Sequence, residues 1–318
     1  MSSPSRILIT GFGSIGQKHF QNVRQILPEA EVALLRTMGP TISGPGISAC
    51  FHSMEEALKF HPEAAIIAGP ASQHEEQGTA LMESVGKLLI EKPLAASREG
   101  AIHIRDAAAK KKTRVIVGYN LRYFQPLRLF RDLIIQEKYG RLHRLECHVG
   151  QHLSAWRLAQ DPSLSVSSRK ELGGGVFREL SHEIDYCLWI CGAPSRVRGR
   201  ASRHLDYGNV EDCADVWLEF INGSHASIHL DMIDPVKRRN ARALCERATL
   251  EFDFLSASIR VNGELLDLGT VAPLQRTYVE ELEDLFGSGE ASPAASCEEG
   301  VAVLDVIEKA EKSASFQG

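Results

Sequence analysis

The first third of the chain alternates between short apolar runs and longer amphipathic segments. Short apolar runs bounded by turn residues are typical of buried strands, and amphipathic segments indicate helices. The runs predict strands at Arg6–Thr10, Glu31–Arg36, Ala64–Ala68, Leu88–Ile90 and Val115–Val117. The amphipathic segments predict helices at Ser14–Leu27, Met54–Phe60, Gln73–Val85 and Ser97–Lys112, with a loop at Gly39–Ser48. Such alternation favours βαβ units and a parallel sheet.

After about residue 120 the pattern changes to alternating polar and apolar positions over successive runs, typical of an antiparallel sheet with one covered face. Strands are predicted at His143–Val149, Arg196–Arg203, Ala214–Phe220, His225–Leu230, Ala248–Phe254 and Ser256–Val261. Helices are predicted at Pro126–Glu137, Val176–Cys191, Tyr278–Phe286 and Glu298–Ala314, with a loop at Asp161–Ser168. The expected fold class is α/β, with domains at 1–120 and 121–318, the second an α+β domain.

Composition narrows the function classes. The chain has 318 residues, of which 43% are hydrophobic and 24% charged, as in globular proteins. The net charge of −5 and the lack of a basic block argue against nucleic-acid or membrane-surface partners. An apolar signal segment is not expected at the start of the chain, nor is a membrane span. Seven cysteines without a CxxC pair favour a reducing cytoplasm, and no metal site is expected.

A glycine-rich turn, Gly11-Phe-Gly13-Ser-Ile-Gly16, follows the first predicted strand and opens the first predicted helix. In this context Gly11 permits the tight turn, Gly13 lets the backbone approach a pyrophosphate, and Gly16 lets helix and strand pack closely. The helix N-terminus, with Ser14 and Ile15, would then face the phosphates. The turn predicts a dinucleotide site; the alternative is an ordinary strand–helix turn.

The second predicted strand ends at Leu35-Arg36-Thr37 and lacks the acidic residue that usually binds the ribose 2′-hydroxyl of NAD. Arg36 and Thr37 could instead contact adenine or a 2′-phosphate. The cofactor is therefore predicted to be NAD or NADP, with NADP favoured. Alternatively, Arg36 is a solvated charge.

A charged turn follows the fourth predicted strand, at Glu91-Lys92-Pro93-Leu94. Ligands of doubly wound sheets bind at this end of the strands. Taken alone, the segment could be a surface ion pair before a proline turn. Further motifs follow in order: Gly118-Tyr119-Asn120-Leu-Arg122-Tyr123, then Gly173-Gly174-Gly175, then Glu179-Leu-Ser-His182-Glu-Ile-Asp185. In this order the motifs resemble the glucose-fructose oxidoreductase/inositol dehydrogenase (Gfo/Idh/MocA) family over essentially the whole chain.

The resemblance implies a Rossmann domain joined to an α+β domain with a large, mostly antiparallel sheet, whose outer face often forms dimers. It implies a homodimer or homotetramer and a sugar-like or cyclic polyol substrate. By position, Lys92 matches the family's active-site lysine and His182 its catalytic histidine. Further positions match cofactor-lining or substrate-approaching segments: Pro70, Ser72, His74, Glu91, Asn120 and Arg122.

One position departs from the family pattern. Many relatives carry an aspartate four residues before the histidine, where this chain has Arg178. Glu179 lies three residues before His182, and on a continuous helix it would share a face with the ring. Glu179 is therefore the expected substitute for the aspartate.

The expected chemistry is hydride transfer between nicotinamide and a secondary alcohol or ketone. His182 would exchange the hydroxyl proton, Lys92 would stabilise negative charge on the oxygen, and Glu179 or Asp185 would orient the imidazole. The alternative for His182 is a half-buried helix histidine satisfied by a carboxylate. Trp156 and Arg157, with His148 and His152, could shape the substrate pocket; the alternative is an ordinary interface. His225 and His229 are interpreted as sheet or dimer contacts, with metal binding as a remote alternative.

Three function classes remain open. The first is a dehydrogenase or reductase of a sugar or polyol derivative, with a loose similarity to enzymes of bacterial surface-sugar biosynthesis. The second is an NAD-dependent glycosidase that oxidises its sugar transiently, eliminates the aglycone and reduces the product again. The third is a non-catalytic, cofactor-binding sensor on the same scaffold.

Overall fold

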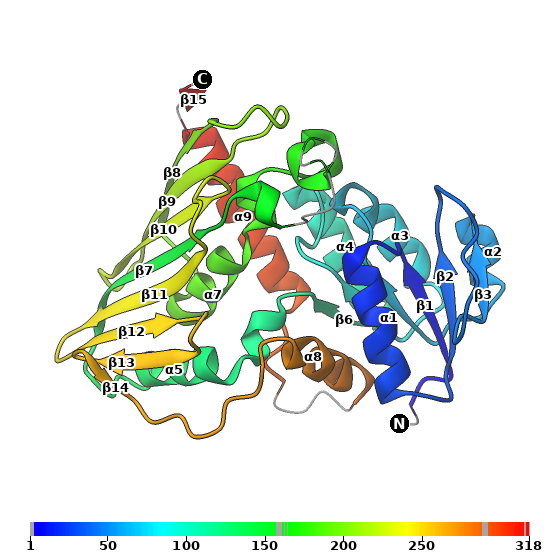
Figure 1. Ribbon diagram of the computed structural model, residues 1–318, viewed down its shortest axis with the longest axis horizontal. Helices are drawn as coiled ribbons and strands as arrows, with labels where there is room; N and C mark the ends of the chain where they lie inside the picture. The colour runs from blue at the N-terminus through cyan, green and yellow to red at the C-terminus, as the bar shows by residue number, and fades with distance from the viewer. Residues whose placement is uncertain are drawn as a thin grey trace. The chain divides into compact units, whose positions relative to one another are not determined.

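A computed structural model describes residues 3–156, 161, 163, 165–287, 292–314 and 316–317. The chain divides into two compact units (Figure 1). The first consists of Met1–Tyr123 with Leu274–Val301, and the second of Phe124–Pro273 with Ala302–Gly318. None of the described helices is both long enough and apolar enough to cross a membrane.

The described residues of the first unit form a six-stranded sheet in which every strand is parallel to its neighbours. Its strands are β1 (Arg6–Thr10), β2 (Glu31–Leu35), β3 (Ala49–Phe51), β4 (Ala64–Ile67), β5 (Lys87–Ile90) and β6 (Arg114–Val117). The order β3-β2-β1-β4-β5-β6 reverses direction between β1 and β4. A ligand site is expected beyond the carboxyl ends of the strands at such a switch point. The predicted Rossmann-type sheet is confirmed, with β3 as a short strand that the pattern did not indicate.

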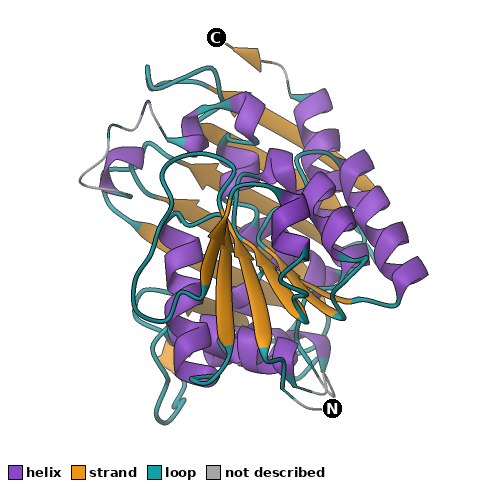
Figure 2. Ribbon diagram, turned by 90° about the vertical axis from the view of Figure 1, so that its right-hand side faces the viewer, coloured by secondary structure: helices purple, strands orange, loops and turns teal. Residues whose placement is uncertain are grey.

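Helices follow the strands of this unit, as the sequence predicts, and lie beside the twisted fan of strands (Figure 2). They are α1 (Ser14–Ile26), α2 (Met54–Leu58), α3 (His74–Leu81) and α4 (Arg98–Lys111). Two of them begin at serine caps: Ser53 Oγ accepts from the amide of Glu56 at 3.2 Å, and Ser97 Oγ from that of Gly100 at 3.1 Å. Each cap satisfies an amide that the helix itself leaves without a partner.

A late segment of the chain completes the first unit. Helix α8 (Arg276–Phe286) packs beside α1, and its Leu282, Leu285 and Phe286 join the core cluster that contains Ile7 and Val32. The amide of Val117 at the end of β6 donates to the carbonyl of Ala295 at 3.0 Å. The sequence pattern places this late segment with the second domain, whereas its apolar side chains bury against the first sheet.

The described residues of the second unit form a nine-stranded sheet in the order β14-β13-β12-β11-β7-β10-β9-β8-β15. Its strands are β7 (Leu142–Gly150), β8 (Arg196–Ser202), β9 (Cys213–Glu219), β10 (His225–Asp231), β11 (Arg238–Cys245), β12 (Thr249–Asp253), β13 (Ser258–Val261), β14 (Glu264–Leu265) and β15 (Phe316–Gln317). Neighbours are antiparallel except β7 with β10 and β8 with β15, which are parallel. The mostly antiparallel sheet is thus confirmed.

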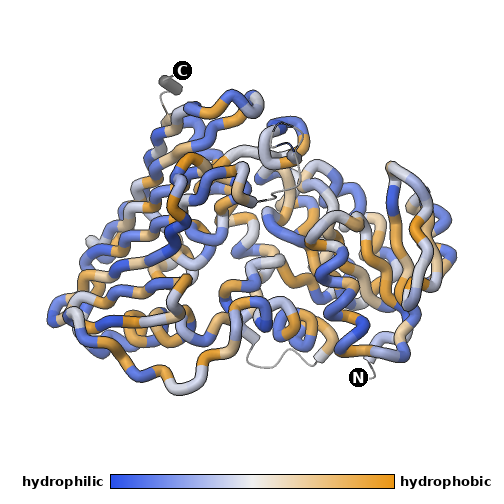
Figure 3. The backbone as a smooth tube through the Cα atoms, in the orientation of Figure 1, coloured by the Kyte–Doolittle hydropathy of each residue, from blue (hydrophilic) through white to orange (hydrophobic). Residues whose placement is uncertain are grey.

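One face of this sheet carries the hydrophobic core of the second unit. Hydrophobic and hydrophilic residues alternate along its strands (Figure 3), so that Leu145, Cys147 and Val149 of β7 are buried while Glu146 and His148 are half-buried. Helices α5 (Gln125–Ile135), α6 (Val176–Glu179) and α7 (His182–Cys191) contact the strands of this unit, and α9 (Cys297–Ser313) begins in the first unit and continues in the second. We call the face that carries Glu146, His148 and His229 the open face.

One predicted helix needs correction, and one strand of the second unit was missed. The single helix expected at Val176–Cys191 is two helices, α6 and α7, separated at Leu180 and Ser181 because Leu180 leaves the helical region (φ −104°, ψ 28°). The strand β11 was not predicted from the sequence. Its buried positions are Ala241 and Ala243, which are small and lie among arginines, so its periodicity lacks the large apolar residues that mark a strand.

Candidate active site

The turn after β1 packs its backbone more closely than any side chain would allow. Gly11 has φ +79°, and a Cβ there would lie 2.7 Å from the amide nitrogen of Gly69. A Cβ on Gly16 would lie 2.2 Å from the carbonyl oxygen of Gly11. Glycine at these two positions therefore lets α1 begin directly against β1 and the end of β4.

The middle glycine of the turn differs from the other two. A Cβ on Gly13 would meet no described atom within 4 Å, and both Gly13 and Ser14 are exposed. Helix α1 begins at Ser14 with no side-chain cap and no acidic residue in its first turn. Its first amides and the positive end of its dipole therefore face open space beside Gly13, as the binding of a pyrophosphate requires.

At the end of β2, Arg36 is half-buried and Thr37 is exposed. The Arg36 guanidinium donates to the carbonyl of Pro40 through Nη1, which holds the side chain beside the loop that follows. Residues 35–40 contain no carboxylate. This strand end therefore presents a positive charge where sites that bind NAD usually present a negative one.

The segment after β4 contains Pro70, half-buried, and Ser72, exposed. His74 is fully buried at the start of α3, with Nδ1 at 3.0 Å from the carbonyl oxygen of Pro93 and Nε2 at 3.0 Å from that of Gly69. Burial lowers the pKa of His74, although these carbonyls act in the opposite direction. The ring thus ties together the loops that follow β4 and β5.

Glu91, at the end of β5, is buried and contacts a histidine that the sequence analysis did not identify. Its Oε1 lies 2.7 Å from Nε2 of His19 on α1, and because a carboxylate only accepts, the ring is the donor. Its Oε2 accepts from the amide of Lys92 at 3.2 Å, and a Cβ on Gly118 would lie 2.9 Å from the same oxygen. Glu91 therefore connects the end of β5 to α1 and lies against the backbone that follows β6. In the sequence, only the position of His19 three residues after Gly16 indicates that it lies near the glycine-rich turn.

Lys92 directly follows Glu91 at the carboxyl end of β5, and its side chain is half-buried. The peptide bond from Lys92 to Pro93 is cis. The lysine thus lies at the strand end where ligands of such sheets bind, on a backbone that Glu91 and His74 hold from two sides.

Asn120 and Arg122 are buried within the first unit. Asn120 Nδ2 donates to Thr277 Oγ1 at 2.7 Å, and Arg122 Nη1 lies 2.7 Å from Oε1 of Glu299. These contacts hold the late segment of the chain against η2 (Asn120–Tyr123), a short 3₁₀ turn. Both residues therefore have a structural role in this unit, and their contact with substrate stays a prediction.

In the second unit, three glycines lead into α6. A Cβ on Gly174 would lie 2.4 Å from the carbonyl oxygen of Val166, and one on Gly175 would lie 2.4 Å from Oε1 of Glu211. The amide of Val176 donates to the carbonyl of Glu211 at 3.1 Å. The glycines thus fix the start of α6, and with it the path of the chain towards His182.

His182 is the first residue of α7 and is half-buried, while Glu179 is the last residue of α6. The helix is interrupted between them, so the expectation of one continuous helix is wrong, and the role of Glu179 as the substitute for the aspartate stays a prediction. Arg178, at the position where relatives carry aspartate, forms an ion pair with Glu311 of α9 through both terminal nitrogens. Burial raises the pKa of the neighbouring Glu211, and Arg178 opposes that shift.

The segment that follows β7 is described only in part. Trp156 is half-buried, and its Nε1 donates to the carbonyl of Gln151 at 3.0 Å, whereas Arg157 lies outside the described residues.

Glu183, beside His182, is buried in a bidentate ion pair with Arg239, with oxygen–nitrogen distances of 2.7 and 3.1 Å. Glu183 is therefore a structural residue of this unit.

Two family models match the chain. Residues 5–119 match the model for an oxidoreductase family with an NAD-binding Rossmann fold, and residues 127–251 match the GFO/IDH/MocA C-terminal domain. Together they span most of both compact units.

Curated relatives cover shorter parts of the chain. Inositol 2-dehydrogenase of Streptomyces avermitilis is 26% identical over 219 residues, 65% of this chain and 60% of the relative. Glucose-6-phosphate 3-dehydrogenase of Bacillus subtilis is 30% identical over 140 residues, 44% of this chain and 39% of the relative. The chain thus matches less than two thirds of the length of these relatives.

Solved structures share the fold over nearly the whole chain. GenD2 from gentamicin A biosynthesis, in complex with NAD, has a TM-score of 0.81 at 19% identity and covers 98% of this chain and 95% of its own. The WlbA dehydrogenase of Bordetella pertussis, in complex with NADH and UDP-GlcNAcA, has a TM-score of 0.80 at 20% identity, covering 97% and 96%.

Proposed function

The chain belongs to the GFO/IDH/MocA oxidoreductase family, and we propose that it transfers hydride between a nicotinamide dinucleotide and a secondary alcohol or ketone of a sugar or polyol derivative. The observation that carries the proposal is the turn at Gly11–Gly16. Its backbone is packed tightly at Gly11 and Gly16, yet leaves open space at Gly13 beside the uncapped start of α1. A binder of uncharged ligands has no need of such an arrangement, whereas a dinucleotide pyrophosphate does.

In this proposal each site residue has its own chemical role. When bound, the nicotinamide supplies the hydride acceptor or donor. The half-buried His182 exchanges the proton of the reacting hydroxyl, because imidazole titrates near neutral pH. The Lys92 ammonium stabilises negative charge that develops on the same oxygen. His74 and Glu91 act at a distance, by holding the backbone on either side of Lys92.

The substrate is proposed to be a sugar or cyclic polyol, including acidic or nucleotide-linked sugars. Support comes from the names of related proteins: inositol 2-dehydrogenase is named for a cyclic polyol, and WlbA is seen with UDP-GlcNAcA. Levoglucosan dehydrogenase, seen with NADH and levoglucosan, shares the fold with a TM-score of 0.79 at 18% identity. A role in surface-sugar synthesis is the narrower form of this proposal.

A panel of four compounds tests the reaction class. Purified protein with NAD or NADP is expected to form NAD(P)H with at least one of inositol, glucose 6-phosphate, UDP-N-acetylglucosamine and levoglucosan, followed by absorbance. Each compound carries secondary alcohols, so His182 could exchange the hydroxyl proton and Lys92 could stabilise the oxygen in the same way for all four. Release of an aglycone from a glycoside without net NAD(P)H would identify the glycosidase. Cofactor binding without turnover of any compound, including glycosides, would favour the sensor.

The cofactor preference follows from the end of β2. NADPH is expected to bind more tightly than NADH, because Arg36 and Thr37 replace the usual acidic residue. Arg36→Ala is expected to weaken NADPH by roughly tenfold or more, as the loss of one charge-assisted hydrogen bond implies, and to leave NADH nearly unchanged. Fluorescence titration of both cofactors measures this. Tighter binding of NADH by the wild type contradicts the assignment of Arg36.

A further inference from the structure

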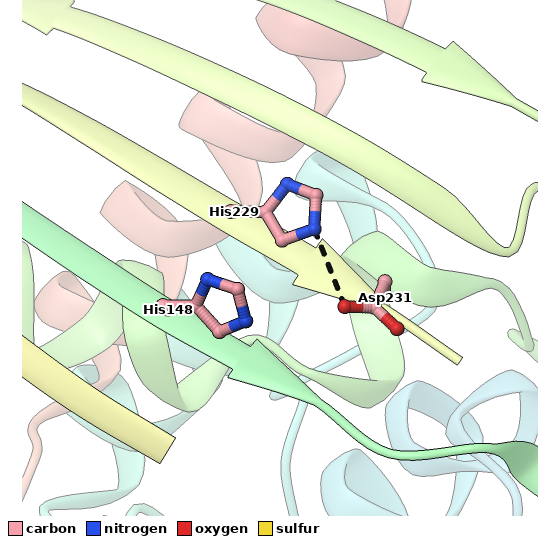
Figure 4. A group of neighbouring side chains, drawn as sticks. All are labelled: His148, His229 and Asp231. Carbon is pink, nitrogen blue, oxygen red and sulfur yellow. Dashed lines mark ion pairs between the residues drawn. The ribbon is translucent and has the colours of Figure 1, made fainter. Parts of the chain in front are cut away.

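Three side chains with metal-binding atoms meet on the open face of the sheet in the second unit. His148 of β7 and His229 of β10 are directly paired in the parallel register, and Asp231 lies two residues beyond His229 on the same face (Figure 4). One nitrogen or oxygen from each of the three lies within 4.8 Å of the others. The two rings lie side by side, with centroids 4.8 Å apart.

The Asp231 carboxylate is held in place before any ligand arrives. Its Oδ1 accepts from the amides of Ile233 at 3.0 Å and Asp234 at 2.7 Å, and the residue is only 3% exposed. Its Oδ2 lies 3.2 Å from Nε2 of His229. On the neighbouring strand Gly150 makes room, since a Cβ there would lie 2.2 Å from Oδ2. The backbone amides thus fix one oxygen and leave the other directed towards the imidazole.

A second carboxylate orients the ring of His229. Asp215 of β9 is paired with His229 of β10 in the antiparallel register, and its Oδ1 lies 2.8 Å from Nδ1 of the ring. The opposite nitrogen, Nε2, therefore faces Asp231. Histidines that bind metals are commonly held in this way, with the second nitrogen donating to a carboxylate.

His148 supplies a nitrogen with no other use among the described residues. Its Nε2 is inaccessible to solvent, and no described atom lies within hydrogen-bonding distance of it. A neutral imidazole keeps its proton on one nitrogen, so Nε2 of His148 can offer a lone pair to a metal ion. A buried nitrogen without a partner is costly unless a ligand satisfies it.

The local field favours a cation. The His229 ring lies between two carboxylates, with Nδ1 at 2.8 Å from Oδ1 of Asp215 and Nε2 at 3.2 Å from Oδ2 of Asp231. Asp234 adds negative charge near His148, and Arg238 adds positive charge. A metal ion bound at Nε2 of His229 would lie beside the Asp231 carboxylate, while Asp215 stays at the opposite nitrogen.

We propose that His148, His229 and Asp231 bind one divalent transition-metal ion of the Zn²⁺ class, with Asp215 as the residue that positions His229. Two imidazoles and a carboxylate are ligands that Zn²⁺ accepts, and bonds of about 2.0 Å at tetrahedral angles place ligand atoms about 3.3 Å apart. The pair formed by His229 and Asp231 already has this spacing, at 3.2 Å. A hollow of about 300 Å³ beside the two imidazoles, lined among others by His148, His229, Asp215 and Arg242, has room for a water molecule as a fourth ligand.

Calorimetric titration of Zn²⁺ into the full chain, after removal of metals with a chelator, tests the site. The wild type is expected to bind one equivalent per chain, and His148→Ala and Asp231→Asn to bind at least tenfold more weakly. His225→Ala is the matched control, because His225 lies on the same face of β10, four residues from His229, and is exposed. An equal loss in the control variant, or no binding by the wild type, overturns the proposal and leaves an imidazolium between two carboxylates.

Two further measurements keep the test independent of folding defects. Zn²⁺ is expected to raise the Tm of the wild type and of His225→Ala but not that of His148→Ala, since a ligand that binds only the folded state stabilises it. Asp215→Asn is expected to keep the stoichiometry and weaken Zn²⁺ binding by about 10- to 100-fold, as for other residues that orient a metal-binding histidine. Unchanged affinity in Asp215→Asn contradicts the positioning role.

Discussion

Lys92→Ala is expected to lower kcat by roughly 10²- to 10³-fold, the size of effect seen when one preorganised charge or donor is removed from a developing oxyanion. The Kd for the cofactor is expected to change little, because the turn at Gly11–Gly16 and the start of α1, which would bind the pyrophosphate, are not altered. The measurement combines turnover of the most active compound of the panel with fluorescence titration of NAD(P)H.

Lys92→Arg is the matched control, since it keeps the positive charge but replaces a compact ammonium with a planar guanidinium. It is expected to recover part of the turnover that the alanine variant loses. A loss of cofactor affinity equal to the loss of turnover would show that Lys92 acts structurally. Thermal unfolding of both variants separates that outcome from simple destabilisation.

Gly13→Val is expected to weaken cofactor binding by roughly 10²- to 10⁴-fold with little loss of stability. The backbone at Gly13 is extended (φ −74°, ψ −166°), which valine adopts readily, and its side chain would project into space that no described atom fills. It would, however, occupy the place of the pyrophosphate and displace two or so charge-assisted hydrogen bonds, worth about 1.5–3 kcal/mol each. Fluorescence titration measures the affinity and thermal unfolding the stability.

Gly16→Ala supplies the contrast. Its new methyl group would lie 2.2 Å from the carbonyl oxygen of Gly11, so that α1 must move away from β1. We expect this variant to lose stability, by about 1–3 kcal/mol as for other overpacked sites, together with affinity. If Gly13→Val unfolds as readily as Gly16→Ala, the space at Gly13 is needed for folding and not for a ligand.

Local features of the first unit were predictable from the sequence. The strand before Gly11, the glycines and the helix after them are contiguous, and each follows from a short-range rule of periodicity or backbone freedom. The caps at Ser53 and Ser97 belong to the same class. Such features need no knowledge of the rest of the fold.

Contacts between distant segments were not predictable. His19 and Glu91 lie 72 positions apart in the sequence, and nothing in either segment identifies the other as its partner. The group formed by His148, His229 and Asp231 depends on which strands are neighbours and on their register, so that spacing along the chain does not reveal it. The hydrogen bond from Asn120 to Thr277 likewise depends on the packing of α8 against η2, which neither segment indicates by itself.

The break between α6 and α7 shows a third kind of limit. Residues from Val176 to Cys191 have helical character throughout, and no glycine or proline lies between them to mark an interruption. The interruption arises at Leu180, which is buried among its neighbours in the second unit. Tertiary packing overrides the local helix preference here. The argument for Glu179 from its spacing on a continuous helix therefore no longer applies.

The position of α8 in the first unit also bears on how the protein is made. Ribosomes release the N-terminal strands first, but the core around Ile7 and Val32 also needs Leu282, Leu285 and Phe286. Until residue 286 has been translated, the core on this face of the sheet contains Val23 of α1 but lacks the side chains of α8. The unit whose strands emerge first can therefore complete its core only after the strands β7 to β14 of the second unit have been translated, which makes the incompletely covered face a natural target for chaperones.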